Sequence, residues 1–130
     1  MLELSPHPEG GHYRETWRLD NGYARGAGTS IYYRLEAGER SRWHRIDATE
    51  TWHFYAGAPL ELLSFAEGGE VIRRVLGANL ALGEQPQLQI QPNEWQSAAS
   101  LGDWTLVGCT VCPAFEFERF ELAPEGWKPG

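Results

Sequence analysis

The stretch Gly38–Gly57 reads GERSRWHRIDATETWHFYAG and is the most informative part of the chain. Its last third is rich in aromatic and β-branched residues and ends at a glycine, which is typical of a strand followed by a turn. Successive side chains of a strand point to opposite faces, so Glu50, Trp52 and Phe54 share one face. A carboxylate beside two large aromatic side chains predicts a buried polar group, which needs a hydrogen-bond partner.

The rest of the chain also consists of short apolar segments separated by turn residues. Fifteen Gly and eight Pro cut it into short segments, and no segment shows the apolar spacing of a long amphipathic helix. Short β-branched and aromatic runs between turn residues predict strands. Besides Thr51–Tyr55, the expected strands are Thr29–Leu35, Leu60–Phe65, Val71–Leu76, Gln87–Gln91, Trp95–Ala98, Trp104–Cys112 and Phe115–Leu122. Gly68 and Gly69 predict a hairpin turn. This pattern favours one all-β domain over residues 1–130, with a barrel core at about residues 12–122.

Composition limits the function. The chain carries 18 acidic and 11 basic residues, a net charge of -7, and its arginines are scattered among acids. Such a surface repels a phosphate backbone and an anionic bilayer, so we expect neither nucleic acid nor membrane as a partner. There is no signal-peptide pattern and no apolar run long enough to span a bilayer. With only two cysteines, we expect a cytoplasmic protein.

Those cysteines, Cys109 and Cys112, have a C-x-x-C spacing inside a strand pattern. A zinc knuckle needs two further ligands nearby, and a redox motif belongs at the start of a helix. We therefore interpret both as buried free thiols.

Gly38, His44, Glu50 and Gly57 follow the pattern G-x5-H-x5-E-x6-G. This resembles the first cupin motif, in which a His, a second His two residues on, and a Glu project into a barrel and bind a divalent metal. Ile46 stands at the second His, and it faces the same way as His44.

The second cupin motif is matched more weakly. Pro92 and Asn93 can be laid on its Pro-x-Gly element, because Asn tolerates the left-handed backbone that Gly adopts there. Gln96 then occupies the last metal-binding His position. An amide oxygen is a poor ligand for a transition metal. A divalent metal on His44, Glu50 and Gln96 is one interpretation; a hydrogen bond between His44 and Glu50 alone is another.

Further motifs resemble cupin family 5, a family of small cupins long labelled as a domain of unknown function. They cover about residues 7–122: His7–Gly11, Trp43–Arg45, Glu50–Gly57, Trp95–Gln96, Val107–Val111, Pro113 and Phe115–Phe117. The resemblance implies a jelly-roll β-barrel (a double-stranded β-helix), commonly a homodimer, without a settled activity. Members are similar in fold to dTDP-sugar epimerases and seed storage proteins.

The epimerase resemblance gives His44 the role of general base, with Glu50 orienting the imidazole ring or tuning its pKa. Tyr13, Tyr32 and Tyr33 are all candidates for the acid. We expect the barrel to bind a small polar metabolite. The residues expected to contact it are Ser41, Trp43, Trp52, Phe54, Gln96 and Tyr33. The first hypothesis is a metal-independent epimerase or isomerase. The alternatives are a metal-dependent cupin enzyme and a non-catalytic ligand-binding or sensing module.

Overall fold

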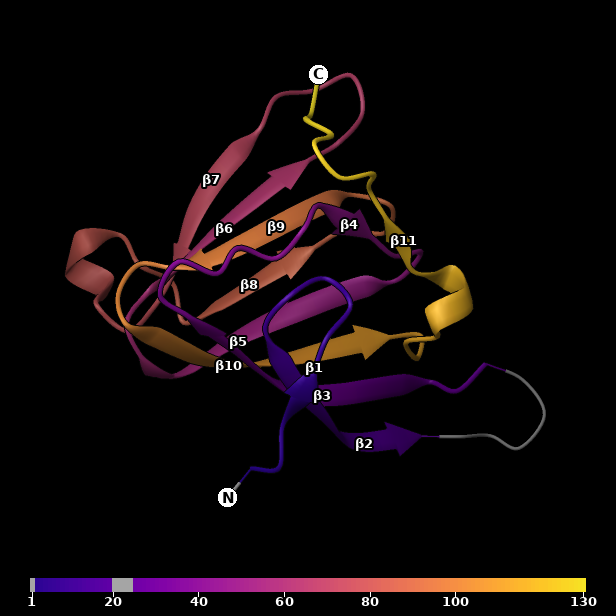
Figure 1. Ribbon diagram of the computed structural model, residues 1–130, viewed down its shortest axis with the longest axis horizontal. Coiled ribbons are helices and arrows are strands. Elements are labelled where there is room, and N and C mark those ends of the chain that lie inside the picture. Colours follow the sequence, from indigo (N-terminus) through magenta and orange to yellow (C-terminus); the bar gives the residue numbers. More distant parts are fainter. Residues whose placement is uncertain (1, 20–24) are drawn as a thin grey trace.

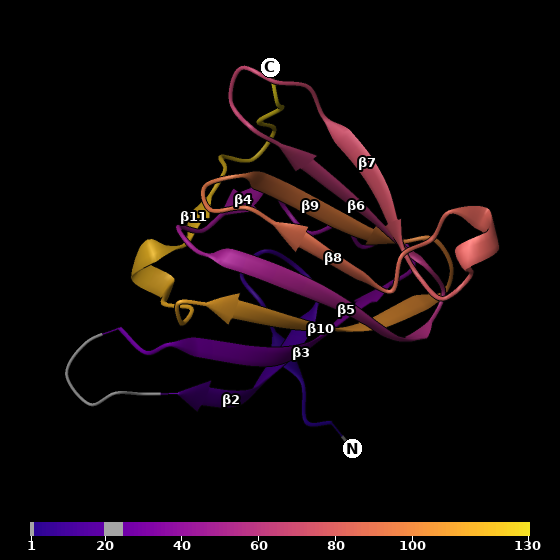
Figure 2. The same ribbon diagram turned by 180° about the vertical axis from the view of Figure 1, so that it is seen from behind.

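The computed structural model describes residues 2–19 and 25–130. Two antiparallel sheets curl around a shared interior, as Figures 1 and 2 show from opposite sides. The first sheet has the strand order β1 (Ser5–Pro6), β2 (His12–Leu19), β3 (Gly28–Glu36), β10 (Trp104–Cys112), β5 (Thr49–Gly57) and β8 (Gln87–Ile90). The second has the order β11 (Glu121–Leu122), β4 (His44–Arg45), β9 (Trp95–Ser100), β6 (Leu60–Phe65) and β7 (Ile72–Leu76). The short 3-10 helices are η1 (Leu80–Leu82) and η2 (Phe117–Arg119).

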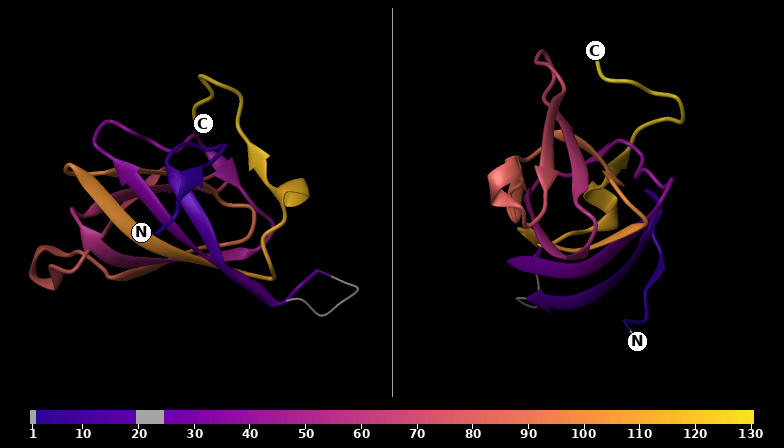
Figure 3. Two further views of the ribbon diagram at one scale, coloured as in Figure 1. Left: turned by 60° about the horizontal axis from the view of Figure 1, so that its bottom comes forward. Right: turned by 90° about the vertical axis from the view of Figure 1, so that its left-hand side faces the viewer.

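This arrangement confirms the predicted all-β jelly-roll barrel. The view along the barrel in Figure 3 shows the two sheets facing each other across the interior. The strands β6 and β10 have the predicted bounds, and the hairpin of β6 and β7 turns at Gly68 and Gly69 as expected. Asn93 adopts a φ of 66°, the left-handed backbone inferred for it from the second motif. No helix among the described residues is long and apolar enough to cross a membrane.

Buried and partly exposed side chains alternate strictly in the segment leading into β5, and the buried ones fill the interior. From residue 44 to residue 50, the even-numbered side chains are buried and the odd-numbered ones are partly exposed. Trp52 continues the buried row and is 1% exposed. It belongs to the main core cluster, whose members come from both sheets: Tyr33, Leu35, Trp52, Leu60, Leu62, Leu76, Leu88, Ile90, Ala98, Val107 and Cys109. Burial of this apolar surface is the main force that closes the barrel.

Two expectations were wrong, and one strand was missed. The segment Phe115–Leu122 is not one strand: it turns through η2 and pairs only as the two-residue strand β11 with β4. Strand β2 was not foreseen, because its Arg and Glu residues leave it largely exposed and without a clear apolar face. Cys109 is a buried free thiol as predicted, but Cys112 is exposed, since residues three apart on a strand point to opposite faces.

Candidate active site

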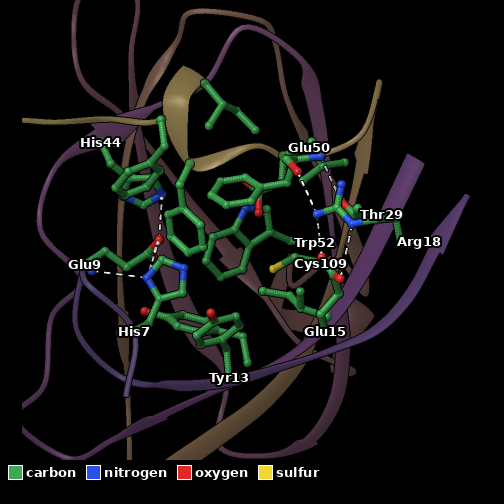
Figure 4. Close-up of a pocket in the computed structure, with 17 residues that line it drawn as sticks. His7, Glu9, Tyr13, Glu15, Arg18, Thr29, His44, Glu50, Trp52 and Cys109 are labelled. Carbon is green, nitrogen blue, oxygen red and sulfur yellow. Dashed lines mark hydrogen bonds and ion pairs between the residues drawn. The ribbon is translucent and has the colours of Figure 1, made fainter. Parts of the chain in front are cut away.

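A cavity of about 250 Å³ opens inside the barrel between the first sheet and the chain around η2 (Figure 4). Its polar lining includes three carboxyl groups, Glu9, Glu15 and Glu50, and two imidazoles, His7 and His44. Its walls are mainly aromatic and aliphatic: Tyr13, Ile31, Tyr33, Ile46, Trp52, Val111, Phe115, Phe117 and Phe120. A small concave site with a few convergent polar groups on apolar walls has the form of a ligand-binding or catalytic site.

His44 lies on β4 with its side chain 3% exposed. Its Nδ1 lies 2.7 Å from the carbonyl oxygen of Arg42. A carbonyl can only accept, so Nδ1 carries the hydrogen and Nε2 of the neutral ring is left with a lone pair. Burial lowers the pKa of His44 to about 4, despite the opposing effect of the Arg42 carbonyl. His44 is therefore a neutral base at physiological pH, with its basic nitrogen directed at Glu9, 3.3 Å away.

Glu9 is placed by the glycine turn that follows it. Gly11 has a φ of +75°, and a Cβ there would lie 2.8 Å from the carbonyl oxygen of Arg34, so only glycine lets the turn close. The turn holds Glu9 Oε1 3.3 Å from His44 Nε2 and 3.4 Å from His7 Nδ1. The Glu9 backbone N–H also donates to His7 Nδ1, at 3.1 Å, which makes that nitrogen an acceptor.

Both nitrogens that face the Glu9 carboxyl therefore offer lone pairs. Burial raises the pKa of Glu9 well above its usual value, and the nearby Glu50 adds to the rise, while the Tyr33 hydroxyl acts in the opposite direction. Burial also lowers the pKa of His7 to about 4, with a further contribution from His44. The usual order of the pKa values of a carboxyl and an imidazole is inverted here. The carboxyl keeps its proton, and the imidazoles stay neutral. Glu9 is the hydrogen-bond donor of this cluster.

Glu50 is surrounded differently. Gln96, which pairs with His44 across β4 and β9, donates its side-chain N–H to Glu50 Oε1 at 2.6 Å. Gln96 Oε1 in turn accepts the indole N–H of Trp52 at 2.9 Å. Burial raises the pKa of Glu50 to about 7, while hydrogen bonds from Gln96 and the Cys109 thiol act in the opposite direction. The fixed amide donor and the thiol make this carboxyl an acceptor.

The structure brings some of the expected site residues to the cavity. His44, Glu50, Trp52 and Tyr33 line it. His44 and Glu50 do not bond to each other, however: the imidazole meets Glu9 and Arg42, so the orienting role inferred for Glu50 was wrong.

The other expected contact residues lie behind the lining or away from it. Gln96 is fully buried and reaches the cavity only through Glu50 and Trp52. The Ser41 hydroxyl accepts the backbone N–H of Ala98 and ties the chain before β4 to β9. Trp43 packs against Trp127 in a separate aromatic cluster, and Phe54 packs against the main core. Ser41 and Trp43 were predicted from their short sequence distance to His44, Phe54 from strand parity, and Gln96 from the second cupin motif. None of these criteria measures depth in the barrel.

Two groups of cavity residues were missed. His7 and Glu9 were quoted only as part of a family motif; the signal was a His and a Glu immediately before a Gly-Gly turn. Phe117 and Phe120 would lie on opposite faces of the strand expected over Phe115–Leu122, but η2 brings both to the cavity. The tyrosine candidates are narrowed: Tyr13 and Tyr33 line the cavity, whereas Tyr32 packs against Tyr55 on the other face of the sheet.

Comparison with known proteins agrees with this fold. A family model described as Cupin superfamily (DUF985), Cupin_5, matches residues 1–123. The chain belongs to this cupin family. A protein from Shewanella oneidensis is 40% identical over 94% of this cupin and 79% of its own chain, with a TM-score of 0.89. A hypothetical protein from Leishmania major is 29% identical, with coverages of 94% and 82% and a TM-score of 0.86.

More distant cupins share the fold alone. Oxalate decarboxylase from Bacillus subtilis is 14% identical over 92% of this chain and 30% of its own, with a TM-score of 0.72. No curated protein matches this cupin. Membership of the family therefore establishes the fold of this chain but not an activity.

Cupins often bind metals through the side chains of their two motifs. The four ligand positions of the cupin motifs hold His44, Ile46, Glu50 and Gln96. Ile46 offers no donor, and the only ligating atom of Gln96 already accepts the Trp52 indole N–H. Among residues 2–19 and 25–130, no group of three or more His, Cys, Asp or Glu side chains is arranged to hold a metal ion. This donor set does not fit the cupin metal site.

Proposed function

We propose that the barrel is an acid–base enzyme of the isomerase or epimerase type, with His44 as the base and Glu9 as the acid. Its reaction is proton transfer at a carbon next to a carbonyl group of a small molecule. The observation that carries this proposal is the neutral pair formed by His44 Nε2 and Glu9 Oε1, 3.3 Å apart at the cavity. Titratable groups with pKa values displaced in opposite directions are typical of acid–base sites.

The pair can enolise a carbonyl compound without leaving net charge in the cavity. The substrate oxygen accepts a hydrogen bond from the Glu9 O–H, while His44 Nε2 removes a proton from the adjacent carbon. The electrons of the broken C–H bond form a C=C bond, and the proton of Glu9 passes to the carbonyl oxygen. The products are a neutral enol and an imidazolium–carboxylate pair, whose charges stabilise each other in this buried place.

The return step replaces the proton on carbon. For reprotonation from the same side, His44 itself is placed to return the proton. For inversion, the proton comes from the opposite side, and Tyr13 and Tyr33 are the tyrosines that line the cavity. The hydroxyl of Tyr33 donates to the carbonyl oxygen of Gly10 at 2.7 Å, so delivery from Tyr33 requires that bond to break. Tyr13 is the simpler candidate for the second acid.

The test follows deuterium exchange from D2O into the carbon next to the carbonyl of 2-hydroxyacetophenone, read by proton NMR. His44→Asn keeps an N–H donor for Arg42 and removes the base, so exchange should fall by about 100-fold or more. His44→Gln serves as a second variant. His53→Asn is the matched control, because His53 contacts Thr110 and Gln87 outside the cavity lining.

Two results contradict the proposal. One is undiminished exchange in the folded His44 variants. The other is a wild-type protein that binds 2-hydroxyacetophenone in the cavity and releases it without exchange above the His44→Asn rate; that result favours the binding-only hypothesis. The mainly apolar lining is the observation that keeps a binding module as the second candidate.

A further inference from the structure

The charges that face the cavity are unevenly distributed. Its basic lining residues, among the described part of the chain, are His7, His44 and Arg18. The pKa of each imidazole is lowered to about 4, so neither is a cation at neutral pH. The Arg18 guanidinium is held by Glu15 through two hydrogen bonds, of 2.8 and 3.3 Å, and by the carbonyl oxygen of Phe115. The cavity thus presents no uncompensated positive charge from these three residues to an anion.

Glu50 is the residue that provides negative charge to the cavity. Its side chain lies on the same face of β5 as Trp52, and both are tied together through Gln96. Gln96 and Cys109, which are both uncharged donors, form hydrogen bonds to its carboxyl. Of the other carboxyls of the lining, Glu9 keeps its proton and Glu15 is paired with Arg18. A buried carboxylate without a cationic partner among the described residues lacks the counter-charge that such groups usually have.

The walls beside Glu50 suit a cation as well. Trp52 and the three phenylalanines of the 115–120 segment line the cavity, and Phe115 packs against both Phe117 and Phe120, with ring centroids 4.9 and 5.7 Å apart. The faces of aromatic rings attract cations, most strongly when the cation is removed from water. The net charge of -7 on the whole chain favours the approach of a cation over that of an anion.

We infer that the molecule bound in this cavity carries a basic nitrogen, held as a cation between the Glu50 carboxylate and the aromatic walls. The inference names the substrate class for the proposed reaction and rests on that proposal only in placing the ligand in the same cavity. A cation beside Glu50 favours the ionised carboxylate, so ligand and counter-charge stabilise each other. Glu50 is then a specificity-determining residue, and Glu9 and His44 act on another part of the ligand.

The experiment compares three probes with the same ring and different charge: benzylamine, benzyl alcohol and benzoate. Each is titrated into the intact protein at about pH 8, and binding is followed by the indole N–H signal of Trp52 in a ¹H–¹⁵N spectrum, assigned with Trp52→Phe. We expect benzylamine to bind about tenfold more tightly than benzyl alcohol, as a charge-assisted hydrogen bond in place of a neutral one implies. Benzoate should bind more weakly than either.

Glu50→Gln should abolish the preference, so that benzylamine and benzyl alcohol differ by less than about twofold, while the exposed control Glu67→Gln should keep it. Benzoate binding as tightly as benzylamine, or a preference that survives in Glu50→Gln, would overturn the inference. So would the failure of all three probes to move the Trp52 signal. The wild-type series needs no variant to fold, and none of these binding results depends on turnover. Loss of exchange in His44→Asn together with a preference for benzoate would therefore support the reaction and reject the basic ligand.

Discussion

Glu9 and Glu50 line the same cavity, and burial raises the pKa of both, yet their neighbours differ in kind. Glu9 faces two imidazole nitrogens that accept hydrogen bonds, whereas Glu50 faces an amide N–H and a thiol that donate them. The same side chain is therefore a proton donor in one place and an acceptor in the other. Burial alone makes a carboxyl reluctant to ionise; the polarity of its partners decides which role the group takes.

The two carboxyls also depend on different parts of the chain. Glu50 lies on β5, which is paired on both sides, and the alternation of this strand fixes the direction of the side chain. Glu9 lies in the loop between β1 and β2, at the edge of the same sheet, and the Gly10-Gly11 turn places it. Glu50 is thus part of the barrel wall, whereas the loop between β1 and β2 folds over this wall and positions Glu9.

The largest expected difference is in turnover. Glu9→Gln keeps a hydrogen-bond donor for His44 but cannot transfer a proton, so deuterium exchange into 2-hydroxyacetophenone should fall by about 100-fold or more. In Glu50→Gln the loss should stay below about tenfold, because that carboxyl does not act on the carbonyl. Exposed Glu67→Gln is the control. Equal losses in the two cavity variants would contradict the division of roles.

The next difference is in the pH dependence of stability. The pKa of Glu50 is raised from 4.5 to about 7, so the folded protein holds this proton more tightly and stability is lost as pH rises through that window. The loss approaches about 3 kcal/mol above neutral pH. Glu50→Gln should remove it. Urea unfolding of both proteins from about pH 5 to pH 9 measures the difference, which should grow up to about pH 7 and then level off.

The imidazoles act in the opposite direction on the acid side. The pKa values of His7 and His44 are lowered to about 4, so the folded protein resists their protonation and stability is lost as pH falls from about 6.5 toward 4. Both proteins share this loss, and it cancels in the difference between wild type and Glu50→Gln. A difference curve that is flat across pH 5 to 7 would show that Glu50 is ionised at its ordinary pKa.

The glycine turn allows a third test. In Gly11→Ala the new Cβ meets backbone and side chains within 3.0 Å at a left-handed φ, so the expected cost is about 3 kcal/mol, together with displacement of Glu9. Gly68→Ala has a similar φ of +83° but open space around it, and should cost about 1 kcal/mol. Thermal unfolding measures both. If Gly11→Ala retained both stability and exchange, the turn would not be what holds the acid in place.

The sequence predicted the Glu50 side of this comparison better than the Glu9 side. Alternation from His44 to Trp52 is a local property, and it gave the correct inward face of β5. The contact of His44 with Glu9 joins two distant segments, and no spacing rule connects them. The Phe and Glu residues of 115–122 alternate as in a strand, but Glu116 and Arg119 pair as neighbours three residues apart across η2. Local alternation could not reveal that the segment leaves the sheet to close the cavity.

Gln96 gives the smallest and most local test. It satisfies two buried groups at once, donating to Glu50 and accepting from Trp52. Gln96→Leu therefore leaves the indole N–H without its acceptor and Glu50 with the Cys109 thiol alone. The expected cost is about 2 kcal/mol, against almost none for Gln89→Leu on the exposed face of β8. Loss of the amide donor should also raise the pKa of Glu50 further and weaken benzylamine at a given pH, while the pairing of Glu9 with His44 stays intact. Chemical unfolding and the benzylamine titration report the two effects separately. If the amine binds as before, the acceptor character of Glu50 does not depend on Gln96, and the contrast between the two carboxyls must arise from the rest of the cavity.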